Sequence, residues 1–289
     1  MVDTLRTLLW VPGNNEEKIQ DAFSAGADSI VLDLEDLVPI GEKAKARGLV
    51  VDVINNARNK SFKIGVRINS WNSEFGATDL KAIVKARPDF IRLPKCSTAT
   101  EMQEVDKLIS LLEQEHNVPL NSTKVIVSLE TALGVLNALP IATATSRVIG
   151  LGLGVEDFTT DIRTVRSTKG LELELLYARS HMLLAARAAG VLAVDGAFLD
   201  ISDQEGLVEE VKLIKQLGFD GKSIIHPCQV KPTHEVFAPS KEEVEFARKV
   251  VAAFEAAEKE GSFYVFVDGK LVDPPVLTKA ERILERQVS

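Results

Sequence analysis

The sequence predicts an α/β fold, specifically a TIM (β/α)8 barrel that carries a C-terminal extension of a helix, a β-hairpin and a second helix. Eight short apolar segments recur along the chain, and helical hydrophobic patterns lie between them. Several of these helical stretches are followed by glycine, at Gly26, Gly190 and Gly218, which can end a helix in the left-handed conformation without a Cβ penalty. The 289 residues give room for one barrel of roughly 250 residues and an appendage.

Each apolar segment has the length of a strand and is too short for an independent helix. The eight predicted strands cover residues 8–11, 29–34, 64–68, 90–93, 125–129, 148–151, 191–194 and 223–225. A doubly wound open sheet is the alternative, but its phosphate-binding turn needs a glycine fingerprint after the first strand. The segment Val11-Pro12-Gly13-Asn14-Asn15 does not provide that fingerprint, so a barrel is the better prediction.

The segment after the eighth strand departs from the strand-helix repeat. Ser240-Lys241-Glu242-Glu243 matches a capping box and predicts the start of a long helix that ends at about residue 260. Asp268-Gly269 lies between alternating apolar residues, which predicts a β-hairpin with a type I′ turn. A last helix is expected after Asp273-Pro274-Pro275.

We therefore divide the chain into a barrel domain, residues 1–232, and a C-terminal extension, residues 233–289. An extension of this length is too small to bury its own core. We expect it to pack on the barrel or on a neighbouring subunit.

The composition argues against several classes of partner. The net charge is −8 and no dense run of lysine and arginine occurs, so neither nucleic acid nor an anionic membrane is expected as a partner. No apolar stretch reaches about 18 residues and the first residues lack the pattern of a secretory signal, which predicts a soluble cytoplasmic protein. Cys96 and Cys228 have no metal-ligand spacing and are expected to be free thiols.

Chemistry in a TIM barrel is carried by residues at the carboxyl ends of the strands. Charged and polar side chains follow the predicted strands there: Asp33, Glu35, Asp36, Arg67, Asn69, Lys95, Glu130, Glu156, Asp157 and His226. Glu130 and Asp157 follow the fifth and sixth strands, so their carboxylates are expected to lie side by side. Paired carboxylates suit Mg²⁺, with water and substrate completing an octahedron. The alternative is that both are solvated acids in loops.

Three basic side chains at these strand ends have two interpretations each. Arg67 could clamp a carboxylate or enolate oxygen through two parallel hydrogen bonds, or it could neutralise Glu35 or Asp36 in a structural ion pair. Lys95 could form an imine with a carbonyl substrate only if its pKa were depressed, and adjacent acids act in the opposite direction, so charge pairing or phosphate contact is favoured. His226 could be a base, but a hydrogen-bonded structural role is the more common one.

Seven motifs run through the chain in a fixed order: Leu9-Trp10-Val11-Pro12-Gly13, Leu32-Asp33-Leu34-Glu35-Asp36, Val66-Arg67-Ile68-Asn69, Arg92-Leu93-Pro94-Lys95, Ser128-Leu129-Glu130-Thr131, Gly154-Val155-Glu156-Asp157-Phe158 and Gly221-Lys222-Ser223-Ile224-Ile225-His226-Pro227. In this order they resemble the citrate lyase β-subunit and malyl-CoA and citramalyl-CoA lyase family, a group of TIM-barrel lyases in the HpcH/HpaI aldolase superfamily. The resemblance covers most of the chain.

The resemblance implies roles for individual residues. Glu130 and Asp157 would bind Mg²⁺, Arg67 would contact substrate and stabilise a thioester enolate, and Glu35 with Asp36 would support the metal shell or its waters. We also assign substrate contacts to Asn69, Lys95 and Glu130. In Lys270-Leu271-Val272-Asp273-Pro274, Asp273 matches the acid/base aspartate of the family, which enters the active site of a neighbouring subunit.

The resemblance also implies an activity, the Mg²⁺-dependent retro-Claisen cleavage of a 3-hydroxyacyl thioester. A citryl thioester giving an acetyl thioester and oxaloacetate is favoured, because Ser73-Glu74-Phe75-Gly76 and the stretch Ile162-Arg163-Thr164-Val165-Arg166-Ser167 look like citrate lyase β-subunits. Citramalyl-CoA or malyl-CoA cleavage is the alternative, because Ile225-His226-Pro227 looks more like the CoA-ester lyases. The motifs leave open whether CoA or an acyl carrier protein bears the thioester.

Two other classes of function remain as alternatives. A class II aldolase acting on free 2-keto acids is a weaker rival, because that group lacks a tail like residues 268–273. A non-catalytic scaffold subunit of a lyase complex would keep the acids for stability. The partners expected from the resemblance are a thioester substrate, further copies of the chain in a trimer or hexamer, and citrate lyase α and γ subunits.

Overall fold

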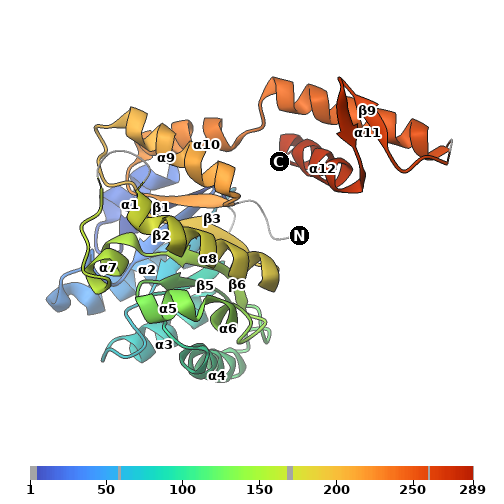
Figure 1. Cartoon of the computed structure of the whole chain (residues 1–289). Helices are drawn as coiled ribbons and strands as arrows, with labels where there is room; N and C mark the ends of the chain where they lie inside the picture. The colour runs from blue at the N-terminus through green and yellow to red at the C-terminus, as the bar shows by residue number, and fades with distance from the viewer. Residues whose placement is uncertain (1–4, 58–59, 168–171, 260, 289) are drawn as a thin grey trace. The chain divides into compact units, whose positions relative to one another are not determined.

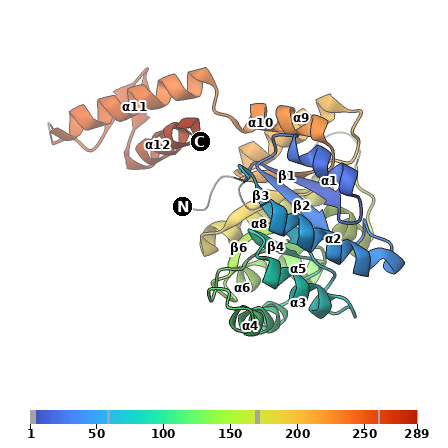
Figure 2. The ribbon, with the colours of Figure 1, turned by 180° about the vertical axis from the view of Figure 1, so that it is seen from behind.

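The computed structural model describes residues 5–57, 60–167, 172–259 and 261–288, and it confirms the predicted α/β barrel. Eight parallel strands pair in sequence order and the eighth pairs with the first, which closes the barrel. The helices that connect the strands lie outside this barrel, as the two opposite views show (Figure 1, Figure 2). The chain separates into two compact units, residues 1–234 and 235–289.

Every predicted apolar run overlaps a strand of the barrel. The strands are β1 (Thr7–Pro12), β2 (Ser29–Asp33), β3 (Lys63–Arg67), β4 (Phe90–Leu93), β5 (Lys124–Leu129), β6 (Val148–Leu153), β7 (Leu192–Asp195) and β8 (Gly221–Ile224). Inside the barrel a core cluster joins residues of several strands, among them Leu8, Val31, Phe90 and Ile126, all of which are buried. Gly65 leaves room for the Phe90 ring, which a Cβ at that position would overlap. Because most residues of the strands are buried, the sequence shows continuous apolar runs.

The helices of the barrel unit follow the expected repeat. They are α1 (Glu16–Phe23), α2 (Lys43–Asn56), α3 (Gly76–Ala86), α4 (Ala99–Glu115), α5 (Ala132–Leu136), α6 (Ala138–Ala142), α7 (Val155–Asp161), α8 (Leu173–Ala189), α9 (Gln204–Leu217) and α10 (Val230–Phe237). Gly190 and Gly218 end α8 and α9 with positive φ, as predicted. Gly26 also has a positive φ, but α1 already ends at Phe23, with Ser24 as its C-cap.

The C-terminal unit contains α11 (Lys241–Lys259), β9 (Val265–Val267), β10 (Lys270–Val272) and α12 (Pro274–Val288). The predicted capping box is present, because the Ser240 N–H donates to Glu243 Oε2 at 2.7 Å and the Glu243 N–H donates to Ser240 Oγ at 3.1 Å. Asp268 and Gly269 both have positive φ, as the predicted type I′ turn requires. Residue 260, the predicted end of the first helix, lies outside the described residues.

This C-terminal unit has a small hydrophobic core of its own. Val250 and Phe254 of α11, Val267 and Val272 of the hairpin and Ala280 of α12 are buried together. The expectation that so short a segment could not bury a core is therefore wrong. The hairpin between the two helices supplies the apolar layer that the length argument overlooked.

Within the described residues, no helix is both long enough and apolar enough to cross a membrane. Cys96 is buried and Cys228 is exposed, and both are free thiols, as predicted.

Candidate active site

The carboxyl ends of β2 to β6 bring together most of the side chains that the sequence singled out. Arg67 at the end of β3 binds Asp33 at the end of β2 through two parallel hydrogen bonds, Nε to Oδ1 at 2.5 Å and NH2 to Oδ2 at 2.7 Å. Its third nitrogen, NH1, lies 3.2 Å from both Glu35 Oε2 and Asp36 Oδ2. Burial lowers the pKa of Arg67, but the Asp33 hydrogen bonds and the neighbouring acids outweigh it and raise the pKa. Arg67 is therefore a fixed, fully charged group.

The sequence missed the leading role of Asp33. It placed Arg67 beside Glu35 or Asp36, whereas the two-bond fork goes to Asp33, which is fully buried. Asp33 also accepts hydrogen bonds from the backbone N–H groups of Glu35 and Leu37. The same carboxylate thus anchors Arg67 and shapes the loop that carries the other two acids.

Lys95 follows β4 and faces three acids. Its Nζ lies 3.2 Å from Glu35 Oε1, 3.6 Å from Asp36 Oδ1 and 3.8 Å from Asp157 Oδ1. Burial lowers the pKa of Lys95, but Glu35 and Asp36 outweigh it and raise the pKa. A protonated amine cannot attack a carbonyl, so the geometry favours charge pairing over an imine.

Glu130, which follows β5, is a buried carboxylate without a hydrogen-bond partner for its Oε2 among the described residues. Only 3% of Glu130 is exposed. Its side chain fits beside Gly154 because that residue has no Cβ, and a Cβ there would overlap the Glu130 side chain. Burial raises the pKa of Glu130 to about 8, and repulsion from Glu35 and Asp157 adds to this while Arg67 and Lys95 oppose it. Desolvated, mutually repelling carboxylates are a place where a bound cation would be stabilising.

Glu35 is also a buried carboxylate with a raised pKa. It is 6% exposed, and its Oε2 also has no hydrogen bond within the described residues, although Arg67 lies near it. Burial, followed by repulsion from Asp36, raises the pKa of Glu35 to about 7, against the attraction of Arg67 and Lys95.

These carboxylates fit a hard divalent cation. Glu130 and Asp157 offer oxygen ligands, and Asp157 lies in the first turn of α7 with its side chain 46% exposed, so a solvent-facing side remains for water and substrate. No cluster of three or more His, Cys, Asp or Glu side chains placed for a metal ion occurs in the described part of the chain. Two carboxylate ligands from the protein suit an ion that keeps several waters, as Mg²⁺ does, better than one held by protein ligands alone.

A buried arginine, Arg92 on β4, interacts electrostatically with Glu130 and was not singled out from the sequence. Its Nε donates to Ser128 Oγ at 2.6 Å, and its guanidinium carbon lies 5.9 Å from the Trp10 ring centroid, whereas that of Arg67 lies 4.8 Å from the same ring. Burial lowers the pKa of Arg92 to about 10 despite the attraction of Glu130. Gly152 makes room for this guanidinium, which a Cβ there would overlap.

Three other predicted residues have different surroundings. Asn69 is buried, and its amide nitrogen donates to Leu34 O and to Asp79 Oδ2. His226 begins a short 3-10 helix, Pro227–Gln229, and its Nδ1 accepts a hydrogen bond from the Cys228 N–H at 3.2 Å, which fits the structural interpretation. Asp273 belongs to the C-terminal unit, where its Oδ1 accepts from the Val276 N–H at the start of α12.

Comparisons with known proteins define the class of the chain. Residues 6–227 match the HpcH/HpaI aldolase/citrate lyase family. The chain belongs to this family, which confirms the resemblance predicted from its motifs.

Particular relatives span nearly the whole chain. The citrate lyase subunit beta of Leuconostoc mesenteroides subsp. cremoris is 45% identical over 280 residues, which is 97% of this chain and 92% of that protein. A (3S)-malyl-CoA thioesterase of Cereibacter sphaeroides strain ATCC 17025 is 37% identical over 97% of this chain and 94% of its own length. The crystal structure of protein CitE from Mycobacterium tuberculosis in complex with magnesium, acetoacetate and coenzyme A has a TM-score of 0.82, with 32% identity and full coverage of both chains.

Proposed function

We propose that this protein is a Mg²⁺-dependent carbon-carbon lyase that cleaves a 3-hydroxyacyl thioester, acting as the β subunit of a citrate lyase. Its substrate would be a citryl thioester, and its products an acetyl thioester and oxaloacetate. The similarity of nearly the whole chain to a citrate lyase subunit beta supports the assignment of a citryl thioester as the substrate. The observation that carries the chemistry is the buried Glu130 carboxylate without a hydrogen bond at Oε2, beside a protonated Arg67 and Lys95.

Glu130 and Asp157 would hold the metal ion, with Glu35 and Asp36 supporting its waters. When bound, Mg²⁺ supplies positive charge that stabilises the oxygen of the forming keto acid. The related CitE structure contains magnesium with acetoacetate and coenzyme A, which supports both the metal and a thioester substrate for this chain. The free volume left by Gly154 is what allows Glu130 to occupy its place.

Arg67 would stabilise the charge that arrives on the thioester oxygen. In the cleavage, the substrate hydroxyl loses its proton to a base, its oxygen becomes the carbonyl of oxaloacetate, and the electron pair of the broken C–C bond passes into the thioester enolate. Asp33 fixes two nitrogens of Arg67, so the guanidinium is oriented before substrate binds. Lys95 would balance the acids and contact substrate.

Asp273 would return a proton to the enolate carbon from a neighbouring subunit. It lies in the C-terminal unit, immediately before α12, and its sequence motif resembles the one that carries the acid/base aspartate of the family. This role requires a homo-oligomer, for which we propose a trimer or a hexamer, and it is compatible with α and γ subunits in a larger citrate lyase.

The experiment that tests this function measures keto-acid release by the purified chain with Mg²⁺. The substrates are citryl-CoA, (S)-citramalyl-CoA, malyl-CoA and a citryl thioester on an acyl carrier protein. We expect citryl thioesters to be cleaved fastest. Faster cleavage of malyl-CoA or citramalyl-CoA would assign the chain to the CoA-ester lyases, which the thioesterase relative also makes relevant. No turnover of any thioester would contradict the lyase function and favour a scaffold.

A further inference from the structure

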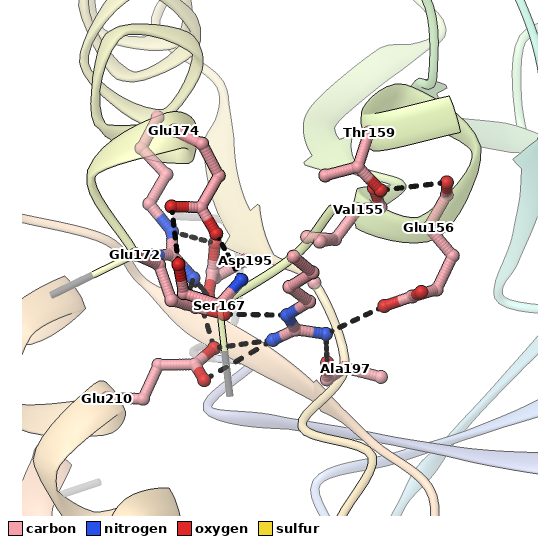
Figure 3. A network of polar contacts seen from close by, with 12 residues as sticks. Val155, Glu156, Thr159, Ser167, Glu172, Glu174, Asp195, Ala197 and Glu210 are labelled. Carbon is pink, nitrogen blue, oxygen red and sulfur yellow. Dashed lines mark hydrogen bonds and ion pairs between the residues drawn. The ribbon is translucent and has the colours of Figure 1, made fainter. Parts of the chain in front are cut away.

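Arg166 contacts three other segments of the barrel unit, one of which is α7, the helix that carries Asp157. It lies between α7 and α8, and its Nε donates to Glu172 Oε1 at 2.6 Å. Its NH1 donates to Glu156 Oε1 at 3.0 Å and to the Ala197 carbonyl at 2.8 Å, and its NH2 lies 3.3 Å from Glu210 Oε2. Figure 3 shows Glu156, Ala197 and Glu210 converging on one guanidinium group from different parts of the chain. A single side chain thus joins α7, the loop after β7 and α9.

The deeper part of this network is a rigid base for Arg166. Arg179 is fully buried and binds Asp195 through two hydrogen bonds of 2.8 and 2.9 Å, and its NH2 also donates to Glu210. The buried Lys222 Nζ donates to Asp195, to Glu210 and to a backbone carbonyl. Because these buried charges are paired and hydrogen-bonded to one another, they hold Glu210 and its neighbours in one arrangement.

Glu156 is the most exposed of the three carboxylates that pair with Arg166. Its side chain is 56% exposed, whereas those of Glu172 and Glu210 are each 6% exposed. Glu156 stands immediately before Asp157 in the first turn of α7, which spans only Val155–Asp161. A helix of two turns has little stability of its own, so external contacts decide how its first turn is oriented.

We propose that Arg166 is a positioning residue: through Glu156 it fixes the first turn of α7 and thereby holds Asp157 where a metal ligand is needed. This inference rests on the proposed role of Asp157 as a Mg²⁺ ligand. In this role Arg166 does not contact the metal ion itself. It acts by connecting α7 to the buried Arg179, Asp195 and Lys222 network.

The direction in which Arg166→Gln changes the affinity for Mg²⁺ distinguishes a positioning role from a simple electrostatic effect. Arg166→Gln removes a positive charge near a cation site, so electrostatics alone would strengthen Mg²⁺ binding. Loss of positioning would weaken it. The matched control is Arg163→Gln, because Arg163 is an exposed residue of the same segment that has the same charge and is not hydrogen-bonded to Glu156.

The first measurement is Mg²⁺ binding to the metal-free protein by calorimetry. We expect Arg166→Gln to weaken binding about fivefold, the scale of one partly exposed ion pair, and Arg163→Gln to leave it unchanged or slightly tighter. In turnover assays the Arg166→Gln enzyme should need more Mg²⁺ for half-maximal rate, while its kcat at saturating Mg²⁺ stays near that of the wild type. Equal or tighter binding by a folded Arg166→Gln protein overturns the proposal.

A second variant keeps the test decisive if Arg166→Gln does not fold. Glu156→Gln removes the exposed partner and leaves the buried network intact. Hydrogen exchange of the α7 amides is then measured without metal, so no ligand charge enters the comparison. We expect faster exchange in α7 but not in α9, and wild-type exchange rates in α7 would overturn the proposal. Failure of the wild-type protein to bind Mg²⁺ would instead count against the proposed function, and the exchange result would still stand.

Discussion

Arg67 combines a fixed orientation with a permanent charge. Its planar guanidinium group can make two parallel hydrogen bonds to one carboxylate, and it stays protonated. Two of its nitrogens are bound to Asp33 and the third faces Glu35 and Asp36. A lysine at this position keeps the charge but cannot form two parallel hydrogen bonds with Asp33. The residue is therefore a sensitive probe of the proposed enolate stabilisation.

We predict that Arg67→Lys lowers kcat about a hundredfold, the scale of losing one preorganised donor to a developing oxyanion. The measurement is steady-state release of oxaloacetate from citryl-CoA at saturating Mg²⁺. Arg6→Lys is the matched control, because Arg6 also binds one carboxylate, that of Asp28, through two hydrogen bonds. These two residues precede β1 and β2, so they do not lie at the carboxyl ends of the strands. The control should lose stability without losing kcat, and an equal loss of kcat in both variants would contradict the assigned role.

Gly154 tests whether the position of Glu130 matters. Its φ is −94°, so alanine is tolerated by the backbone, and the effect of a Cβ arises from its overlap with the Glu130 side chain. We predict that Gly154→Ala weakens Mg²⁺ binding at least tenfold, about 1.4 kcal/mol, as measured by calorimetry. Gly48→Ala is the control, because a Cβ at Gly48 meets no atom within 4 Å and should leave Mg²⁺ binding unchanged. Unchanged binding in both would show that Glu130 does not ligate the ion.

The sequence predicted which residue types gather at the strand ends, but it did not predict which of them pair. Asp33 and Arg67 are register partners across β2 and β3, and this register depends on how the strands pair in the closed barrel. Arg166 and Glu156 meet through a network whose other members include residues of α8, β7, β8 and α9. Such partners become visible only when the strands and helices are placed in space.

At the scale of elements, most boundaries were predictable because local chemistry sets them. Continuous apolar runs marked the strands, glycines with positive φ marked the ends of α8 and α9, and Asp268-Gly269 marked the hairpin. The core of the C-terminal unit was not predicted, because it forms between α11, the hairpin and α12 rather than within one of them. Length alone is a poor guide when three amphipathic elements can bury one face together.

Helix α4 is connected to the sheet by a buried ion pair away from the proposed metal ligands. Glu113 is fully buried, and its two oxygens accept hydrogen bonds of 2.8 and 2.7 Å from Arg147 NH1 and NH2. Burial raises the pKa of Glu113, but the Arg147 hydrogen bonds and backbone donors at Thr123 and Asn121 outweigh it and lower the pKa to about 2. Folding therefore favours the charged form of this carboxyl.

A stability difference that depends on pH follows from this pair. Because the folded pKa is below its ordinary value of 4.5, the stabilisation is complete above pH 4.5 and is lost as the pH falls towards about 2. We predict that Glu113→Gln lowers the free energy of unfolding by about 3 kcal/mol at pH 7, and that the difference from wild type shrinks below pH 4.5. Urea unfolding at several pH values measures it. The exposed Glu115→Gln on the same helix should show no such pH dependence, and a constant Glu113→Gln deficit at all pH values would contradict the account.

At the scale of the whole molecule, the proposed role of Asp273 requires more than one chain. Glu130 and Asp157 belong to the barrel unit, whereas Asp273 belongs to the C-terminal unit. If Asp273 acts on a neighbouring barrel, two inactive variants can complement each other in one oligomer.

We predict that co-assembly of Glu130→Gln and Asp273→Asn chains restores up to about a quarter of wild-type activity, because random mixing pairs an intact barrel with an intact Asp273 at that frequency. Each variant alone should be nearly inactive. Co-assembly of Glu130→Gln with Asp157→Asn is the control, since every barrel then carries a defect and no activity should return. Verified hybrids of the first pair without activity would rule out Asp273 acting between subunits.

The most direct test of the central claim is oxaloacetate release from citryl-CoA by the wild-type protein with Mg²⁺ or with a chelator, beside the Glu130→Gln variant. We predict turnover by the wild type with Mg²⁺ and none with the chelator. In the variant we predict a loss of at least a hundredfold with a Tm no lower than that of the wild type, because glutamine replaces a buried carboxylate whose Oε2 has no hydrogen bond within the described residues. Turnover that needs neither Mg²⁺ nor Glu130 would contradict it.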